Sequence, residues 1–116
     1  MSKVFYQLTI DINKQWHPAI DVLLGVSETK GKEFWCYEII VEDNPIKINE
    51  QTVLLHFMNI LENKYSDLEA MEIQRSDIII YVIYEYNNEC NMEFLPEEMM
   101  LMGKNGIVLA ISCYQT

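Results

Sequence analysis

The sequence has little positive charge. It contains eight lysines and arginines, of which Arg75 is the only arginine, against 18 aspartates and glutamates. A formal net charge of −10 at pH 7 leaves no cationic surface of the kind that binding to a nucleic-acid backbone requires. We therefore exclude nucleic acid and expect a basic protein as the better partner. The alternative is that the charge only keeps the protein soluble.

Long apolar runs are also missing. No run approaches the roughly 18 residues that a membrane helix needs. The first ten residues, MSKVFYQLTI, lack the continuous apolar stretch of a signal peptide. Half of the 116 residues are hydrophobic and only three are prolines, which favours folding over disorder. We expect one cytoplasmic domain over residues 1–116 that has no contact with a membrane.

Residues for metal binding or catalysis are scarce. Cys36, Cys90 and Cys113 stand singly inside apolar stretches, and no closely spaced pair typical of a zinc site occurs. We expect all three to be reduced and buried, and we expect no metal or other cofactor. The two histidines, His17 and His56, fall on separate elements, and no serine has the glycine context of a nucleophile elbow. The sequence therefore predicts a protein that is not an enzyme.

The hydrophobic pattern predicts an α+β domain with a mostly antiparallel sheet of about five strands. Val4 to Ile12 alternates as a half-buried strand does, with the even-numbered residues on the apolar face. Further strands are expected over 33–42, 78–86, 89–94 and 107–114. One long helix is expected from Asn49 to about Tyr65, and two short helices over 18–25 and 96–103, all packed on one face of the sheet.

The two short helices share one design. Residues 18–25 (PAIDVLLG) and 96–103 (PEEMMLMG) both run from a proline to a glycine, and a strand-like stretch follows each. Proline suits the first helical turn, and glycine suits the left-handed residue that ends a helix. The pattern predicts an internal strand–helix–strand duplication. Chance similarity between short amphipathic helices is the alternative.

The strands over 78–86 and 89–94 are predicted to form a hairpin, because Asn87 and Asn88 tolerate the dihedral angles of a tight turn. Counting outward from this turn puts Ile79, Tyr81, Ile83 and Glu85 on the core face. The other face would carry Ile78, Ile80, Val82, Tyr84, Tyr86, Glu89, Asn91 and Glu93. Aliphatic, tyrosine and carboxylate side chains mixed in this way are typical of a binding face. The alternative is that another part of the chain covers it.

Several short motifs carry a likeness to a known family. They are Trp16-His17-Pro18, Leu23-Leu24-Gly25-Val26, Thr29 with Lys30-Gly31, the strand containing Trp35, and the final helix and strand ending near Tyr114. Over nearly its whole length the chain resembles the bacterial proteins called domain of unknown function 4279. Glu28 departs from the pattern, since a proline is expected there. The family has no established catalytic residues, and the resemblance implies an α+β domain with an immunity-like role beside a toxin.

These observations predict a non-enzymatic, immunity-like binding protein for a basic protein partner such as a toxin nuclease. The predicted binding residues are Tyr84, Tyr86, Glu89, Asn91, Glu93, Trp16 and His17. One alternative is a small-ligand sensor with a pocket near Trp16 and Trp35. Another is a homodimer in which the open sheet faces of two copies pair.

Overall fold

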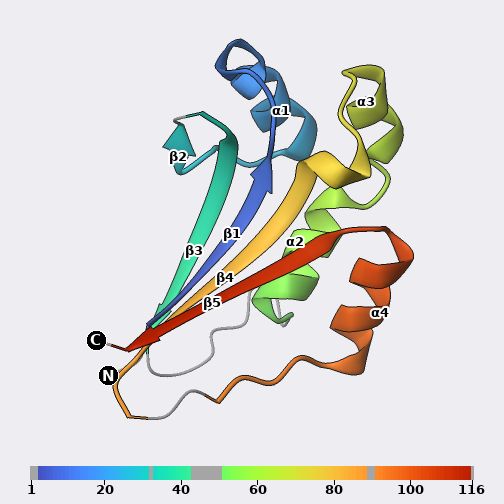
Figure 1. Cartoon of the computed structure of the whole chain (residues 1–116). Coiled ribbons are helices and arrows are strands. Elements are labelled where there is room, and N and C mark those ends of the chain that lie inside the picture. The colour runs from blue at the N-terminus through green and yellow to red at the C-terminus, as the bar shows by residue number, and fades with distance from the viewer. Residues whose placement is uncertain (1–2, 32, 43–50, 89–90, 116) are drawn as a thin grey trace.

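The computed structural model describes residues 3–31, 33–42, 51–88 and 91–115, which form an α+β fold (Figure 1). Its mixed sheet has four full strands, β1 (Lys3–Ile10), β3 (Trp35–Glu42), β4 (Ile78–Tyr86) and β5 (Val108–Gln115), and a two-residue strand, β2 (Lys30–Gly31). The order across the sheet is β2-β3-β1-β4-β5. The helices are α1 (His17–Leu24), α2 (Val53–Leu61), α3 (Tyr65–Ala70) and α4 (Pro96–Lys104), and short 3-10 turns span Lys14–Trp16 and Arg75–Asp77.

The N-terminal strand β1 lies at the centre of the sheet and pairs antiparallel with β3 on one side and β4 on the other. Leu8 and Ile10 are completely buried, and the other even-numbered residues of β1 pack against the same core. The predicted apolar face of this strand is therefore confirmed. Because strand side chains alternate between faces, the pairing also sets which residues of β3 and β4 point to the core.

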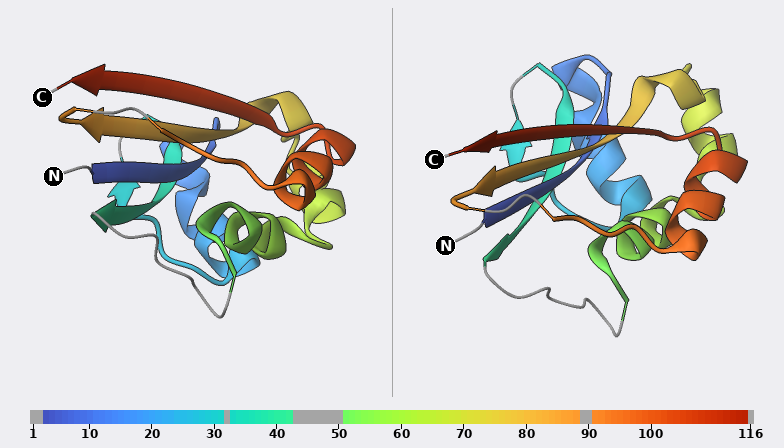
Figure 2. Two further views of the ribbon diagram at one scale, coloured as in Figure 1. Left: turned by 90° about the horizontal axis from the view of Figure 1, so that it is seen from below. Right: turned by 60° about the horizontal axis from the view of Figure 1, so that its bottom comes forward.

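The helices lie on one face of the sheet and beyond one of its ends (Figure 2). Each helix contributes buried side chains to one core cluster shared with the strands. The buried apolar helix residues are Ile20 and Leu24 of α1, Val53, Leu54, Phe57, Met58 and Leu61 of α2, Leu68 of α3 and Met102 of α4. We call the opposite face the outer sheet face, and no helix among the described residues lies over it (Figure 2).

The predicted hairpin is wrong. Residues 91–95 form no strand, and the neighbour of β4 on that side is β5, which runs parallel to it. The chain leaves the sheet after Tyr86 and returns to it through α4, as a parallel connection requires. Met92 and Phe94 pack against the core along the way. The predicted residues Glu89 and Cys90 lie outside the described residues.

The predicted faces of β4 are also reversed. Ile78, Ile80 and Val82 are buried on the helix side, opposite Ile10, Leu8 and Tyr6 of β1. Their odd-numbered neighbours from Ile79 to Glu85 therefore lie on the outer sheet face. The error followed from the hairpin, since the count started from a turn between two strands that do not pair.

The prediction of one long helix needs correction. The expected long helix is two helices, because the chain takes a left-handed conformation at Asn63 (φ 65°), between α2 and α3. The Thr52 hydroxyl caps α2 by accepting a hydrogen bond from the Leu55 N–H at 3.3 Å; the predicted cap, Asn49, lies outside the described residues. Gly25 ends α1 at φ 74°, as predicted.

The duplication is not confirmed. Gly103 lies inside α4, and the chain first becomes left-handed beyond that helix, at Gly106 (φ 69°). The two proline-to-glycine segments therefore end differently. The predicted burial of Cys113 is also wrong, because this residue is exposed on the edge strand β5, whereas Cys36 is buried as expected.

Candidate functional site

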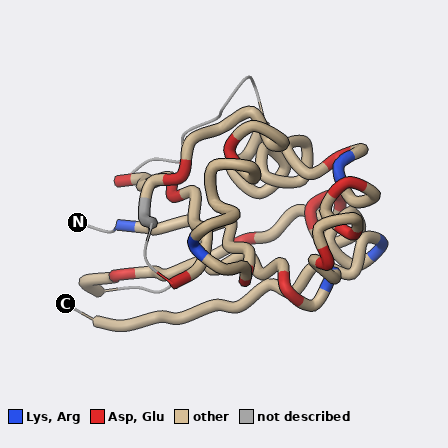
Figure 3. The backbone as a smooth tube through the Cα atoms, turned by 90° about the horizontal axis from the view of Figure 1, so that it is seen from above, with Lys and Arg blue, Asp and Glu red and all other residues tan. Residues whose placement is uncertain are grey.

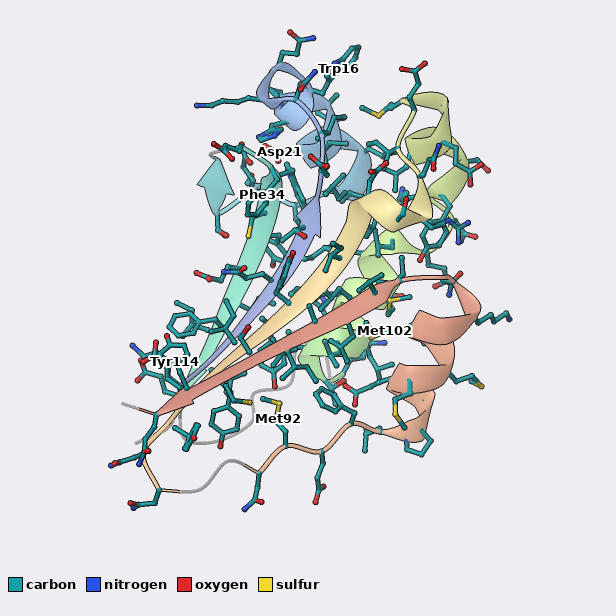
Figure 4. The ribbon with its side chains drawn as sticks, in the orientation of Figure 1. Trp16, Asp21, Phe34, Met92, Met102 and Tyr114 are labelled. Atoms are coloured by element: carbon teal, nitrogen blue, oxygen red, sulfur yellow. The ribbon has the colours of Figure 1, made fainter. Side chains whose placement is uncertain are left out.

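The predicted site residues fall into two groups at opposite ends of the sheet. Tyr84 and Tyr86 end β4, where their rings meet edge to face with centroids 6.2 Å apart. Trp16 and His17 lie at the start of α1, at the far end of the molecule from Tyr114 (Figure 4). The structure therefore does not bring the predicted residues together into one site.

Asn91 and Glu93 of the predicted site do not lie on a strand, and Glu89 is outside the described residues. Asn91 and Glu93 are exposed on the irregular segment that leads to α4. Tyr84 and Tyr86 are half-buried and belong to the helix side of β4. Only Asn91 and Glu93 therefore extend into solvent among the described members of this group.

His17 is buried and serves the fold. Its Nε2 lies 3.1 Å from the carbonyl oxygen of Ile12, which can only accept, so Nε2 carries a proton. Its Nδ1 lies 3.0 Å from Glu28 Oε2, but the two atoms are not in hydrogen-bonding geometry. His17 is only 2% exposed, so it is not available to a partner as the fold stands.

The outer sheet face presents the exposed apolar side chains that the hairpin was expected to present. Phe5 lies between Ile40 of β3 and Ile83 of β4 in the cross-strand register. Ile40 is 45% exposed, Val108 of β5 48% and Tyr114 46%, although all three are strand residues. Thr9 and Cys36 lie on the same side of the sheet but are buried. The outer sheet face consists of the other residues on this side, Lys3, Phe5, Gln7, Glu38, Ile40, Glu42, Ile79, Tyr81, Ile83, Glu85, Val108, Ala110, Ser112 and Tyr114.

Three carboxylates are set among these apolar residues. Glu38 accepts a 2.7 Å hydrogen bond from Gln7 Nε2, and Glu85 accepts one of the same length from the Tyr114 hydroxyl. That bond raises the pKa of Tyr114 above its ordinary value. Glu42 pairs with Lys3 at 3.4 Å. The face thus carries three negative side chains and one positive one, in a fixed arrangement.

Sequence reasoning missed this face because it looked for the site on the hairpin. The odd-numbered residues of β1 already indicated the right face, since an aromatic residue, Phe5, lies opposite the predicted apolar stripe. The sequence of β5 does not indicate which of its residues are exposed. Its sequence from Ile107 to Ile111 is apolar without interruption and shows no alternation.

A polar cleft of about 620 Å³ lies between α2, α3 and α4. The Arg75 guanidinium stacks on the Tyr65 ring at 3.7 Å and donates a 2.8 Å hydrogen bond to the carbonyl oxygen of Asn105. Burial raises the pKa of Tyr65. This cleft does not involve Trp16 or Trp35, near which the pocket was predicted. Trp35 is completely buried within the core, and Trp16 is 47% exposed.

No protein-family profile, curated protein or solved structure matches the chain. The resemblance to domain of unknown function 4279 therefore stays a prediction. None of the helices in the described part of the chain has the length and hydrophobicity to cross a bilayer. Within the same residues, no three histidine, cysteine, aspartate or glutamate side chains converge on a point that would hold a metal ion.

Proposed function

We propose that this chain is a non-enzymatic binding protein whose outer sheet face covers a basic protein partner, in the manner of an immunity protein that neutralises a toxin. The observation that carries the proposal is the exposure of Ile40, Val108 and Tyr114 on one face of a regular sheet, with no helix over it. Exposed apolar and aromatic side chains grouped on one surface mark interaction sites in folded proteins.

The composition of the face supports a protein as the partner. Its centre is apolar, with Phe5, Ile40 and Ile83 in adjacent register positions. Tyr81 and Tyr114 add aromatic rings with a polar end, which are enriched at protein interfaces. An open sheet face of this kind offers no enclosed volume to a small molecule, whereas the surface of another protein can lie against it.

The charge supports a basic partner. Glu38, Glu42 and Glu85 surround the apolar centre, and Lys3 is already paired with Glu42 at 3.4 Å. The whole chain carries a net charge of −10, which attracts a cationic protein and accelerates its encounter. Binding should therefore weaken as salt is added, because exposed charges are screened over about 8–10 Å at physiological ionic strength.

The test first captures a basic protein from a lysate of the host with the purified chain, and then measures its binding by titration calorimetry. Ile40→Ala and Glu42→Lys should each weaken binding, and Glu42→Lys should also reduce its salt dependence. Glu97→Lys is the matched control, since it makes the same charge change at an exposed site in α4, away from the outer sheet face. Equal loss with Glu97→Lys, or full binding by Ile40→Ala, would contradict the proposal.

A second candidate function rests on the polar cleft of about 620 Å³ between α2, α3 and α4, which suits a small polar ligand. Its lining contains two cationic side chains, two carboxylates and two amides, from Arg75, Lys104, Glu62, Glu97, Asn59 and Asn63. A thermal-shift screen of small polar molecules tests it. A rise in melting temperature that Lys104→Ala abolishes would favour this function over the first.

A further inference from the structure

We infer that the free edge of β5 pairs with β5 of a second copy of this chain, so that two sheets join into one across a two-fold axis. This inference goes beyond the proposed function, because it uses the edge of the sheet and not its outer face. β5 is the last strand in the sheet order, with β4 as its neighbour. On its other side, no backbone hydrogen bond links it to another of the residues that the structure describes.

The two edges of the sheet are built differently. At the β3 edge, the short strand β2 pairs with Trp35 and Cys36, and the Thr29 hydroxyl accepts a 2.7 Å hydrogen bond from the Glu38 N–H. That edge also carries the carboxylates of Glu38 and Glu42. Short edge strands and charges are the usual means by which proteins prevent strands of other molecules from pairing.

The β5 edge has none of these protections. Residues 105–116 (NGIVLAISCYQT) contain no charged residue and no proline. Figure 3 shows the strand as an uncharged stretch up to the C-terminal end of the chain. Five consecutive residues of this eight-residue strand, 111–115, are exposed, and Ile111 is 47% exposed. An edge strand that is long, apolar and uncharged is a template for pairing with another strand.

Charge favours a second copy as the occupant of this edge. Two molecules that each carry a net charge of −10 repel one another over most of their surfaces. Two copies can approach with least repulsion where carboxylates are absent, and β5 offers eight consecutive residues without one. The nearest carboxylate on β4 belongs to Glu85, and the Tyr114 hydroxyl donates a hydrogen bond to it.

The two-fold symmetry limits the register. Residues that face one another across an antiparallel pair lie on the same face of the sheet, so each residue must meet one of its own parity. Two registers pair seven of the eight residues of β5, one centred on Ile111 and one on Ser112. We take the register that puts Ile111 opposite its own copy, because it brings more apolar side chains together. Leu109 then meets Cys113, Ala110 meets Ser112, and Val108 meets Tyr114. Apolar contacts would form on both faces of the joined sheet.

The experiment is light scattering on the purified chain alone, over a range of concentrations. A monomer has a mass of 13.7 kDa, so the paired form has twice that, 27.4 kDa. Ile111→Glu places two carboxylates against each other on the axis, and we expect it to raise the dissociation constant of the dimer at least about tenfold. Ser112→Glu tests the same strand from its other face. Val22→Glu is the matched control, because Val22 is 84% exposed on α1.

A dimer that both β5 variants dissociate and Val22→Glu preserves supports the inference. A native mass of 13.7 kDa at every concentration overturns it. So does a dimer that persists in both β5 variants but dissociates in Ile40→Glu, because that result places the contact on the outer sheet face. These measurements contain no partner protein. A negative result would therefore overturn the dimer without contradicting the proposed function, which is tested separately.

Discussion

The indole Nε1 of Trp35 donates a 2.8 Å hydrogen bond to Asp21 Oδ1, which ties β3 to α1. The same oxygen accepts a 3.1 Å hydrogen bond from the backbone N–H of Glu28. One carboxylate oxygen therefore holds a strand, a helix and the loop between them. Trp35 is completely buried, so its N–H has no access to water as a substitute acceptor.

Asp21→Ala should lower the free energy of unfolding by about 1–3 kcal/mol, because it leaves a buried N–H donor without an acceptor. Asp21→Asn should cost less, since its amide oxygen can still accept. Asp11→Ala, at an exposed aspartate, is the control. Urea unfolding of the four proteins measures the differences. If Asp11→Ala costs as much as Asp21→Ala, the hydrogen bond does not have the role given to it here.

The two glycines of the proline-to-glycine segments should respond to alanine in opposite ways. Gly25 has φ 74°, where a side chain costs about 1–2 kcal/mol. Gly103 is helical, and a Cβ there meets nothing within 4 Å. We therefore expect Gly25→Ala to lower the thermal midpoint and Gly103→Ala to leave it equal or raise it, by up to about 1 kcal/mol in stability. If both substitutions lowered the thermal midpoint, or both raised it, the two glycines would not differ in backbone conformation as described.

Glu98 links the first turns of α4 and α2. Its Oε1 accepts a 2.6 Å hydrogen bond from the Leu95 N–H, and its Oε2 accepts a 2.8 Å bond from the Thr52 hydroxyl. The side chain is only 4% exposed. Glu98→Ala should therefore cost about 2–3 kcal/mol, as expected for hydrogen bonds to a buried charged group. Glu98→Gln should cost less.

The neighbouring Glu97→Ala is the control for this prediction, because Glu97 lies in the same turn and is exposed. Guanidinium unfolding provides the free energies. Equal costs at the two positions would mean that the contacts of Glu98 contribute no more than a surface carboxylate does.

Stability should fall at alkaline pH partly through Tyr6. Burial raises the pKa of Tyr6 above its ordinary 10.0, and the charges of Glu98 and Tyr84 raise it further. The unfolded chain thus loses this proton at a lower pH than the folded chain does. The resulting stabilisation is complete below the unfolded pKa and is lost as pH rises through the folded pKa.

In the Tyr6→Phe variant, the side chain at this position has no ionisable group. We therefore expect its urea midpoint to decline less steeply than that of the native chain between about pH 9 and about pH 12. The other tyrosines are present in both proteins, so they do not affect the comparison. Parallel curves would contradict the prediction.

The sequence predicted an element correctly where its local pattern allowed only one interpretation. The alternation of β1 identified its buried face, and the proline and glycine around α1 identified both of its ends. The strand over 33–42 was also found, since β3 spans Trp35–Glu42. In each case the local pattern and the tertiary packing agree.

The faces of β4 could not be found in this way. Residues 78–84 (IIIYVIY) are apolar or aromatic at every position, so periodicity does not distinguish the two sides. Pairing with β1 decides the matter, and that pairing joins residues about 70 positions apart, such as Thr9 and Ile79. The candidate site could not be found from local periodicity either, because the outer sheet face forms only when β3, β1, β4 and β5 pair side by side.

The central place of β1 sets the order in which this protein can fold during synthesis. The ribosome releases β1 first, but its two partners end at Glu42 and Tyr86. Until then the central strand has only one neighbour at most, and its apolar face has no complete core to pack against. Pairings between distant segments also form slowly. A nascent chain of this protein therefore remains dependent on protection from aggregation until β4 has left the ribosome.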